Sequence, residues 1–371
     1  MEFINKIVKT EHRDKKILKK MKLLKKDVML FGAGSMAIFT LKNLYRYGIK
    51  PICFCDNDPQ KQGGNFFGLP VLSYEVFKKK NKRKNYFIII STSAYCKEIY
   101  NWLKKQKEKN PIFFEMYACD PFSKEPTNYN FVKDNINEFE KVYNFFKDKL
   151  SKETMVKIIN FKISGDRKYV DKIYRKNIYF DKNIIKLNNN EVYMDIGAYT
   201  GDSIDRFIIA TAGKYKKIIA IEPDRNNFFV LKKHIRIKKY KNVELYNICV
   251  LDRRGTINFL GGLAGSSGIM EENFLLKQQN YKVNVIKIDD IMKDNKVDII
   301  KMDIEGSELK ALKGCEKTIR KWKPQLAISV YHRREDLLNI PLMIKSIVPE
   351  YKLYLRHYSK SMLDTVLYAV I

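Results

Sequence analysis

The stretch V-Y-M-D-I-G-A-Y-T-G-D (Val192–Asp202) decides the fold of the C-terminal half of the chain. The apolar run over 192–196 predicts a buried strand, and the pattern over 203–212 predicts a helix. Between them, Gly197 and Gly201 allow the backbone to approach a ligand closely. A strand, glycine turn and helix in this order direct free backbone N–H groups at that ligand, so the stretch predicts a nucleotide site.

Acidic residues and further apolar runs extend this pattern. Asp195 ends the first strand, and Glu222 follows the next apolar run at 218–221, where a carboxylate would meet a ribose diol. Helical patterns alternate with the later runs. The further strands are predicted at 243–249, 297–302, 326–330, 352–356 and 365–371. This alternation predicts an open α/β sheet.

Four blocks of this half occur together in a family-specific order. They are D-I-G-A-Y-T-G-D, I-E-P-D-x-x-N-F, V-D-I-I-K-M-D-I-E-G-S-E-L-K-A-L-K-G and K-P-Q-L-A-I-S-V-Y-H. With the ending L-Y-L-R-H-Y-S…D-T-V-L-Y-A-V, they resemble the FkbM family of S-adenosylmethionine-dependent O-methyltransferases over residues 190–371. The resemblance implies a Rossmann-like methyltransferase domain whose seven-stranded sheet has an antiparallel last strand, and methyl transfer to a hydroxyl.

The resemblance also implies where the cofactor S-adenosylmethionine binds. Asp195, Gly197 and Gly201 should frame its methionine part, and Glu222 should bind the ribose hydroxyls. Many members of the family carry Asn where this chain has Tyr199, so the tyrosine would stack on the cofactor instead of bonding its carboxylate. The adenine should lie near 247–250, which adds Asn247 and Cys249 to the cofactor-binding residues.

Catalytic candidates follow the later strands. Methyl transfer is an in-line displacement that is helped by a base at the acceptor hydroxyl. Asp303 and Glu305 follow the fourth strand, and His332 follows the fifth, at the sheet edge where open α/β folds bind ligands. We expect His332 or Asp303 to be the base and Glu305 to orient the acceptor. Glu305 could instead cap the next helix, and Asp303 could bond backbone amides. His357, in the terminal strand pair, is a further candidate or a packed residue.

The N-terminal part contains a second glycine turn. Gly32 and Gly34 follow an apolar run, and Asp56 ends the next one at close to the dinucleotide spacing. The wider pattern D-N-D-P-x-K-x-G…G-L-P-V-L-S resembles the small Rossmann-like domain of sugar O-acetyltransferases that binds nucleotide-linked sugars. A ligand-free docking domain is the alternative for this region.

The chain of 371 residues suits two domains. Pro121, Pro126 and a polar stretch mark a connector, and helical spacing follows it to about 160. We predict a helical arm over 1–25, a small Rossmann-like domain over 26–125, a helical linker over 126–180 and a methyltransferase domain over 181–371.

The composition excludes several classes. No apolar stretch reaches the ~20 residues of a membrane span, and residues 1–20 lack a signal core, so we expect a cytoplasmic protein. The net charge of +29 comes mostly from lysine, whereas base and phosphate recognition favours arginine, so nucleic acid is not the expected partner. Six cysteines without a C-x-x-C pair and four histidines show no zinc spacing, and we predict no metal.

We therefore predict an O-methyltransferase acting on a hydroxyl of a sugar, nucleotide-sugar or glycan. The alternatives are an RNA methyltransferase, which the charge favours, and a catalytically inactive module that binds nucleotides or sugars. The sequence leaves the oligomeric state open, and a homo-oligomer is one alternative.

Overall fold

The computed structural model describes residues 3–82, 85–92, 95–114, 126–261, 268–269 and 280–371. Contact density divides the chain into two units. The N-terminal unit comprises residues 9–128 and 162–166, and the C-terminal unit comprises residues 1–8, 129–161 and 167–371. The chain is a mixed α/β protein whose sheets are mainly parallel.

The N-terminal unit contains a six-stranded sheet of order β3-β4-β2-β1-β5-β6, in which β3 alone is antiparallel to its neighbour. The strands are β1 (Asp27–Phe31), β2 (Cys53–Cys55), β3 (Asn65–Phe66), β4 (Leu69–Leu72), β5 (Tyr86–Ile90) and β6 (Ile112–Phe113). Its helices are α1 (Arg13–Leu24), α2 (Ser35–Arg46), α3 (Tyr74–Lys80) and α4 (Cys96–Lys105). The boundary predicted at 125 and the adjoining residues 115–124 lie outside the described residues.

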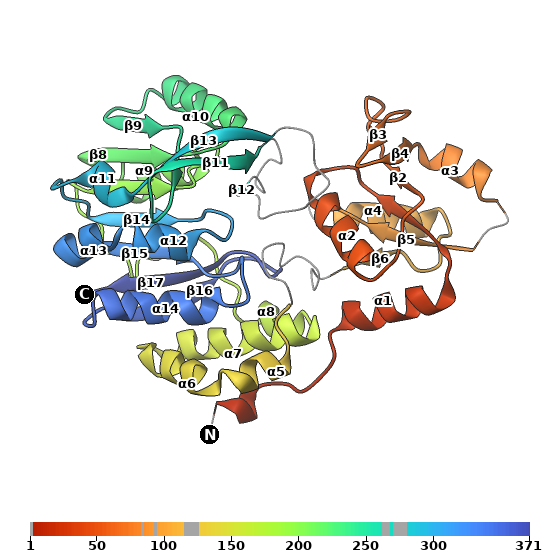
Figure 1. Cartoon of the computed structure of the whole chain (residues 1–371), viewed down its shortest axis with the longest axis horizontal. Helices are drawn as coiled ribbons and strands as arrows, with labels where there is room; N and C mark the ends of the chain where they lie inside the picture. The colour runs from red at the N-terminus through yellow and green to blue at the C-terminus, as the bar shows by residue number, and fades with distance from the viewer. Residues whose placement is uncertain (1–2, 83–84, 93–94, 115–125, 262–267, 270–279) are drawn as a thin grey trace. The chain divides into compact units, whose positions relative to one another are not determined.

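The C-terminal unit is built on a seven-stranded sheet of order β16-β17-β15-β14-β7-β8-β9 (Figure 1). The strands are β7 (Val192–Ile196), β8 (Lys217–Ile221), β9 (Val243–Tyr246), β14 (Ile299–Met302), β15 (Gln325–Ser329), β16 (Lys352–His357) and β17 (Thr365–Val370). The last strand, β17, runs antiparallel between β15 and β16. Central strand β7 is buried at every residue, including Asp195, which is charged.

The register of β7, β8 and β14 aligns the carboxyl ends of these three strands. Ile196 at the end of β7 pairs with Ile221 of β8 and with Met302 of β14. The residues that follow these three strands therefore meet at the carboxyl edge of the sheet, between the first strand and its neighbours on both sides.

Helices cover the sheet of the C-terminal unit. They are α8 (Lys168–Asp171), α9 (Asp202–Ala210), α10 (Arg225–Lys238), α11 (Ile288–Met292), α12 (Glu308–Lys313), α13 (Glu316–Trp322) and α14 (Asp336–Ile347). Helices α9 and α10 bury Phe207 and Leu231 in one hydrophobic cluster with Tyr193 of β7. Asp224 caps α10 by accepting hydrogen bonds from the backbone N–H groups of Asn226 and Asn227.

Most of the segment assigned to a linker from the sequence, residues 129–161 and 167–180, falls in the same unit as the second sheet. It forms α5 (Tyr129–Asp134), α6 (Ile136–Phe145) and α7 (Lys149–Ser164). Helix α6 packs against α14, and Phe3, next to the 3-10 turn Ile4–Lys6, stacks on Phe139 of α6.

A small four-stranded sheet of order β10-β13-β11-β12 adjoins the main one. Its strands are β10 (Cys249–Val250), β11 (Gly255–Leu260), β12 (Gly268–Ile269) and β13 (Asn280–Ile286). In the part of the chain that the structure describes, no helix combines the length and apolar character needed to cross a membrane.

Candidate active site

The glycine turn after β7 is held in a conformation that side chains disfavour. Gly197 has a φ of +81° and Gly201 a φ of +103°, and the intervening Tyr199 also has a positive φ of +49°. A Cβ atom on Gly197 would lie 1.9 Å from the carbonyl oxygen of Asp303. Glycine is therefore required here for two reasons, the backbone conformation and the close approach of the turn to the end of β14.

Asp195 lies behind this turn and supports it. The Asp195 carboxylate is fully buried, 3.0 Å from Lys301 Nζ, and it accepts a 2.5 Å hydrogen bond from Ser203 Oγ. Lys301 Nζ also donates to the carbonyl oxygen of Gly197 at 2.5 Å. Burial raises the pKa of Asp195, and the neighbouring Lys301 charge opposes that shift. Asp195 does not line the cavity, and its bond network fixes the turn, so its place among the cofactor-binding residues stays a prediction.

Glu222 connects the turn to the end of β8. One carboxylate oxygen accepts from the backbone N–H of Tyr199 and the other from that of Asp224, both at 2.9 Å. Burial raises the pKa of Glu222 to about 7, although the two backbone donors oppose the shift. Each carboxylate oxygen can accept a further hydrogen bond, so Glu222 is arranged to receive two hydroxyl donors.

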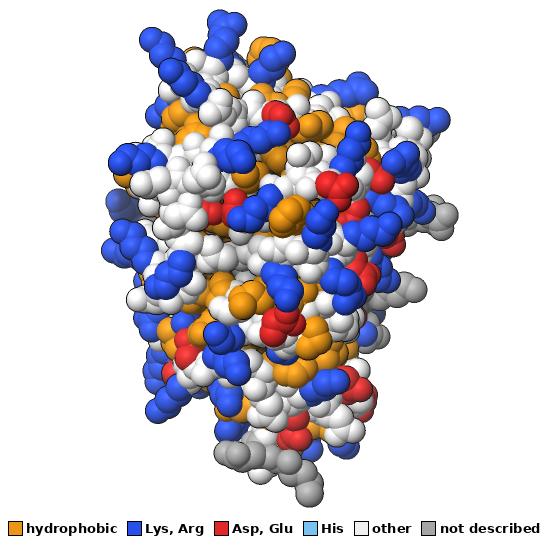
Figure 2. Space-filling model, turned by 90° about the vertical axis from the view of Figure 1, so that its left-hand side faces the viewer, with side chains coloured by type: hydrophobic (Ala, Val, Ile, Leu, Met, Phe, Trp, Pro, Cys, Tyr) orange, Lys and Arg blue, Asp and Glu red, His pale blue; other side chains and the backbone are white. Residues whose placement is uncertain are grey.

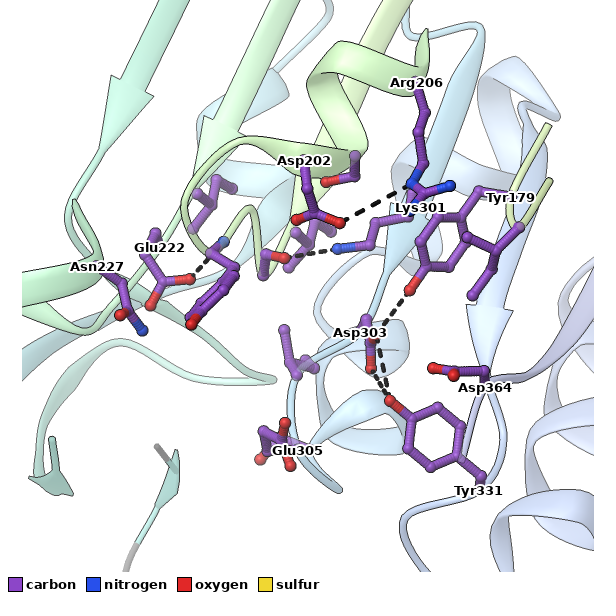
Figure 3. Close-up of a pocket in the computed structure, with 18 of the residues that line it drawn as sticks. Tyr179, Asp202, Arg206, Glu222, Asn227, Lys301, Asp303, Glu305, Tyr331 and Asp364 are labelled. Atoms are coloured by element: carbon purple, nitrogen blue, oxygen red, sulfur yellow. Dashed lines mark hydrogen bonds and ion pairs between the residues drawn. The ribbon is translucent and has the colours of Figure 1, made fainter. Parts of the chain in front are cut away.

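A cavity of about 580 Å³ opens in front of these residues (Figure 3). Gly197, Tyr199, Glu222 and Cys249 line it, together with the apolar side chains of Val250 and Phe259. Asn247 does not line it, because its side-chain amide donates to the carbonyl oxygens of Glu222 and Pro223. Gly201 does not line it either. A Cβ atom there would lie 2.9 Å from the His234 ring, so Gly201 allows α10 to approach α9.

Acidic and tyrosine side chains form the other wall of the cavity. Asp303 accepts hydrogen bonds from Tyr179 Oη at 2.7 Å and from Tyr331 Oη at 3.0 Å, as Figure 3 shows. Burial alone would raise the pKa of Asp303, but the charges of His332 and Lys301 and the two hydroxyl donors lower it overall. Asp303 is therefore ionised near neutral pH.

Two further carboxyl groups face the same cavity. Glu305, whose side chain is 25% exposed, has a positive φ of +54° just after β14. Burial raises the pKa of Glu305 to about 8, against the charge of His332. Burial likewise raises the pKa of Asp364 to about 6. Together with Glu222, whose pKa is raised to about 7, the cavity thus holds three carboxyl groups whose protonation changes between about pH 6 and 8.

His332 sits behind these acids and not on the cavity wall. Its Nε2 lies 3.4 Å from Asp303 and 3.6 Å from Glu305, and its Nδ1 lies 3.0 Å from Glu308. Burial lowers the pKa of His332, but the three carboxylates raise it to about 10. An imidazolium that keeps its proton at neutral pH cannot accept one, so this geometry argues against the expectation that His332 is the base.

His357 is also placed away from the chemistry. It is fully buried, its Nδ1 lies 3.0 Å from Thr365 Oγ1, and it does not line the cavity. This is the packed arrangement that the sequence left open. Asp303, Glu308 and His332 present ligand atoms within 4.8 Å of one another and could hold a metal ion. In the structure they contact one another directly as ion pairs.

In the glycine turn of the N-terminal unit, the acidic residue Asp56 bonds to the protein's own backbone. Asp56 accepts from the backbone N–H of Ala33 at 2.8 Å and from that of Asp58 at 2.9 Å, and its carboxylate also contacts Lys61. Gly32 has a φ of +108°, and Gly34 is the N-cap of α2. Asp56 therefore closes the turn onto the end of β2.

Several cavity residues were not among those predicted from the sequence. Lys301 carries a signal, because a charged residue inside the apolar run of β14 requires a buried partner. Tyr331 directly precedes His332. Asp364 begins the D-T-V-L-Y-A-V ending, although that pattern gave it no role. Tyr179 comes from a segment without a recognisable pattern, and only the fold brings it to the cavity.

Comparisons with known proteins agree with this architecture. Residues 195–357 match the family model of the methyltransferase FkbM domain. The crystal structure of methyltransferase FkbM from Methylobacillus flagellatus KT is similar with a TM-score of 0.69 and 23% identity, covering 95% of this chain and 92% of that chain. Fibrillarin from Aeropyrum pernix, in complex with S-adenosyl-L-methionine, has a TM-score of 0.33 and 11% identity, covering 51% of this chain and 71% of that chain.

An rRNA methylase from Streptococcus thermophilus has a TM-score of 0.30 and 14% identity, covering 49% of this chain and 87% of that chain. No curated protein matches the sequence. Residues 195–357 are thus similar to the methyltransferase FkbM domain, and the Methylobacillus structure shares the fold along nearly the whole chain. The family match does not reach the N-terminal unit, so the resemblance of that unit to sugar O-acetyltransferase domains gains no support from it.

Proposed function

We propose that this FkbM methyltransferase domain transfers a methyl group from S-adenosylmethionine to a hydroxyl group of a sugar or nucleotide-linked sugar. The observation that carries the proposal is the cavity itself. One of its walls is a glycine turn tied to Glu222, and the other is a carboxylate, Asp303, that already receives two hydroxyl donors. The first wall suits a nucleoside, and the second suits a hydroxylated acceptor.

The residues present fit S-adenosylmethionine in shape and charge. Gly197 lines the cavity without a side chain, because the carbonyl oxygen of Asp303 fills the place that a Cβ atom would take. Glu222 would accept the two ribose hydroxyls, and Val250 and Phe259 offer apolar surface to the adenine. The ionised Asp303 carboxylate on the cavity wall would favour a ligand that carries a positive sulfonium. When bound, the cofactor supplies an electrophilic methyl group.

Within this cavity Glu305 is the better placed base. It faces the cavity, and its raised pKa makes its carboxylate a stronger proton acceptor than that of Asp303. Asp303 and its partners Tyr179 and Tyr331 would orient the acceptor by hydrogen bonds. Glu305 would accept the proton of the acceptor hydroxyl as the hydroxyl oxygen takes the methyl group and displaces the sulfonium sulfur as a neutral thioether. These roles reverse those expected from the sequence for Asp303 and Glu305.

His332 then acts as a positioning residue. Its imidazolium lies within 4 Å of Asp303, Glu305 and Glu308, whose like charges would otherwise repel one another. It holds the three acids together without touching the cavity.

Replacing Glu305 with glutamine tests the base. We expect turnover to fall by about 10²–10⁴-fold, with S-adenosylmethionine affinity within a few-fold of wild type, because glutamine keeps the shape and removes the proton acceptor. Wild-type turnover should rise as pH increases through about 8, where Glu305 loses its proton, and E305Q should lose this rise. The control is Glu316→Gln, which changes an exposed carboxylate on α13. A pH profile shared by E305Q and wild type would remove Glu305 as the base.

The proposed reaction is tested with methyl-labelled S-adenosylmethionine and a panel of free sugars, nucleotide-linked sugars and RNA oligomers. Label on a sugar hydroxyl supports the proposal. Label on RNA alone would assign the enzyme to RNA methylation, and cofactor binding without transfer to any acceptor would indicate an inactive binding module.

A further inference from the structure

Helix α10 (Arg225–Lys238) has an outer face that combines exposed apolar side chains with positive charge. Phe229 is 70% exposed, Val230 46% and Ile237 64%, whereas Leu231 and Ile235 on the inner face are buried. At about 100° per residue, Phe229, Val230 and Ile237 lie on one side of the helix. Exposed apolar residues grouped in this way mark an interaction surface more often than isolated ones do.

The segment that carries this face holds formal charge of one sign only. Between residues 225 and 241 the chain contains seven Lys or Arg residues and no Asp or Glu. All seven are exposed and, among the described residues, in no ion pair. Arg225 packs on the ring of Tyr281, and the other six are Lys232, Lys233, Arg236, Lys238, Lys239 and Lys241. The upper end of the face in Figure 2, where α10 lies, shows Lys and Arg side chains next to apolar ones.

A neighbouring helix extends the apolar surface. His234 of α10 lies 2.8 Å from Asp205 of α9, which fixes the two helices side by side. Ile209 lies one turn beyond Asp205 on α9 and is 79% exposed. We define the α10 face as Phe229, Val230 and Ile237, with the six lysine and arginine residues of the same segment and with Ile209 on the neighbouring helix.

We propose that the α10 face binds the surface of membranes that contain anionic lipids. Phe229, Val230 and Ile237 would enter the boundary between headgroups and acyl chains, while the surrounding cations meet the negative headgroups. Lysine and arginine suit this position because their aliphatic stems can lie against lipid while their charges stay in water. The face would hold the protein on the membrane without crossing it.

Charge and chemistry favour lipid over other occupants. A second copy of the chain would bring two strongly positive faces together, which opposes self-association. Nucleic acid phosphates would use the cations but would leave Ile209, Val230 and Ile237 without a partner. An anionic bilayer is the partner that uses both kinds of side chain.

The helix that carries the face also reaches the cavity. Asn227, in the first turn of α10, lines the cavity, as do Asp202 and Arg206 of α9. Phe229 follows Asn227 by two residues, about 200° around the helix, so the α10 face and the cavity lie on different sides of α10. The inference does not depend on the proposed reaction, because it is measured as binding without cofactor or turnover.

Co-sedimentation of the full chain with two kinds of vesicle tests the proposal. We expect binding to vesicles of phosphatidylcholine mixed with phosphatidylglycerol, weakened by salt, and no binding to phosphatidylcholine alone. The double variant F229Q/I237Q should lower the affinity for the anionic vesicles about tenfold or more, because two inserted side chains are lost. The variant K232Q/K233Q should lower it by a similar factor.

The matched control is L23Q/L24Q, which changes two exposed leucines on α1 of the N-terminal unit, 81% and 42% exposed. It should bind like wild type, and unchanged urea midpoints should show that all variants fold. Three results would overturn the proposal: no binding to anionic vesicles, binding by F229Q/I237Q equal to wild type, or an equal loss in the control. Preference for an RNA oligomer over the vesicles would overturn it as well and would make the face a nucleic-acid surface.

Discussion

The variant Gly197→Ala should lose measurable affinity for S-adenosylmethionine and unfold at a lower urea concentration. The added Cβ would lie 1.9 Å from the carbonyl oxygen of Asp303 and 2.9 Å from its carbonyl carbon, both of which are backbone atoms. Neither can rotate away as a side chain would. Relief of the clash must therefore move the glycine turn or the end of β14, and both form the cavity. We expect a loss of about 3 kcal/mol in the free energy of unfolding.

The matched control for this variant is Gly213→Ala. Gly213 has a φ of +76°, close to the +81° of Gly197, but nothing lies within 4 Å of the point where its added Cβ atom would be. It carries the same backbone strain, about 1 kcal/mol, without the clash. If G197A and G213A bind the cofactor equally well, the turn is not part of the cofactor site.

Lys301→Met should destabilise the C-terminal unit by about 3–5 kcal/mol, because it leaves the Asp195 carboxylate buried without a counter-charge. The Lys301 side chain is only 4% exposed and that of Asp195 is not exposed at all. Methionine has a similar volume, so the change removes the charge and the hydrogen bond to Gly197 while the packing is largely kept. Cofactor affinity should fall with it, since that bond steadies the turn.

The measurement is urea unfolding followed by tryptophan fluorescence. The chain has two tryptophans, Trp102 in the N-terminal unit and Trp322 in the C-terminal unit. In a Trp102→Phe background, Trp322 reports the unfolding of the C-terminal unit alone. The double variant K301M/D195N should be more stable than K301M, because the unpaired charge is gone. A loss below about 1 kcal/mol in K301M would show that the buried pair does not support the turn.

The sequence shows where the strands of the C-terminal unit lie along the chain, because each strand is a distinct apolar run that ends in a polar or glycine turn. That is why Gly197, Glu222 and Asp303 were expected at one sheet edge, and the register of β7, β8 and β14 places them there. The FkbM match over 195–357 agrees with the resemblance carried by the same blocks.

Whether a side chain lines the cavity or lies buried behind it is harder to predict than its position along a strand. Asp195 and His332 end strands at the correct edge, yet both point behind the cavity into ion pairs with Lys301 and with the acids. Tyr179 reaches Asp303 across 124 residues of sequence, so no local pattern could reveal this contact. Helical spacing predicted the helices now labelled α6 and α7, but it does not show which sheet they pack against.

The most direct test of the cofactor site is calorimetric titration of the full chain with S-adenosylmethionine, with NAD as the parallel titrant. We predict binding of S-adenosylmethionine at one site, no heat with NAD, and loss of the signal in Glu222→Ala, which removes both acceptors for the ribose hydroxyls. No binding of S-adenosylmethionine, with NAD bound instead, would contradict the assignment and place the nucleotide site at the glycine turn of the N-terminal unit.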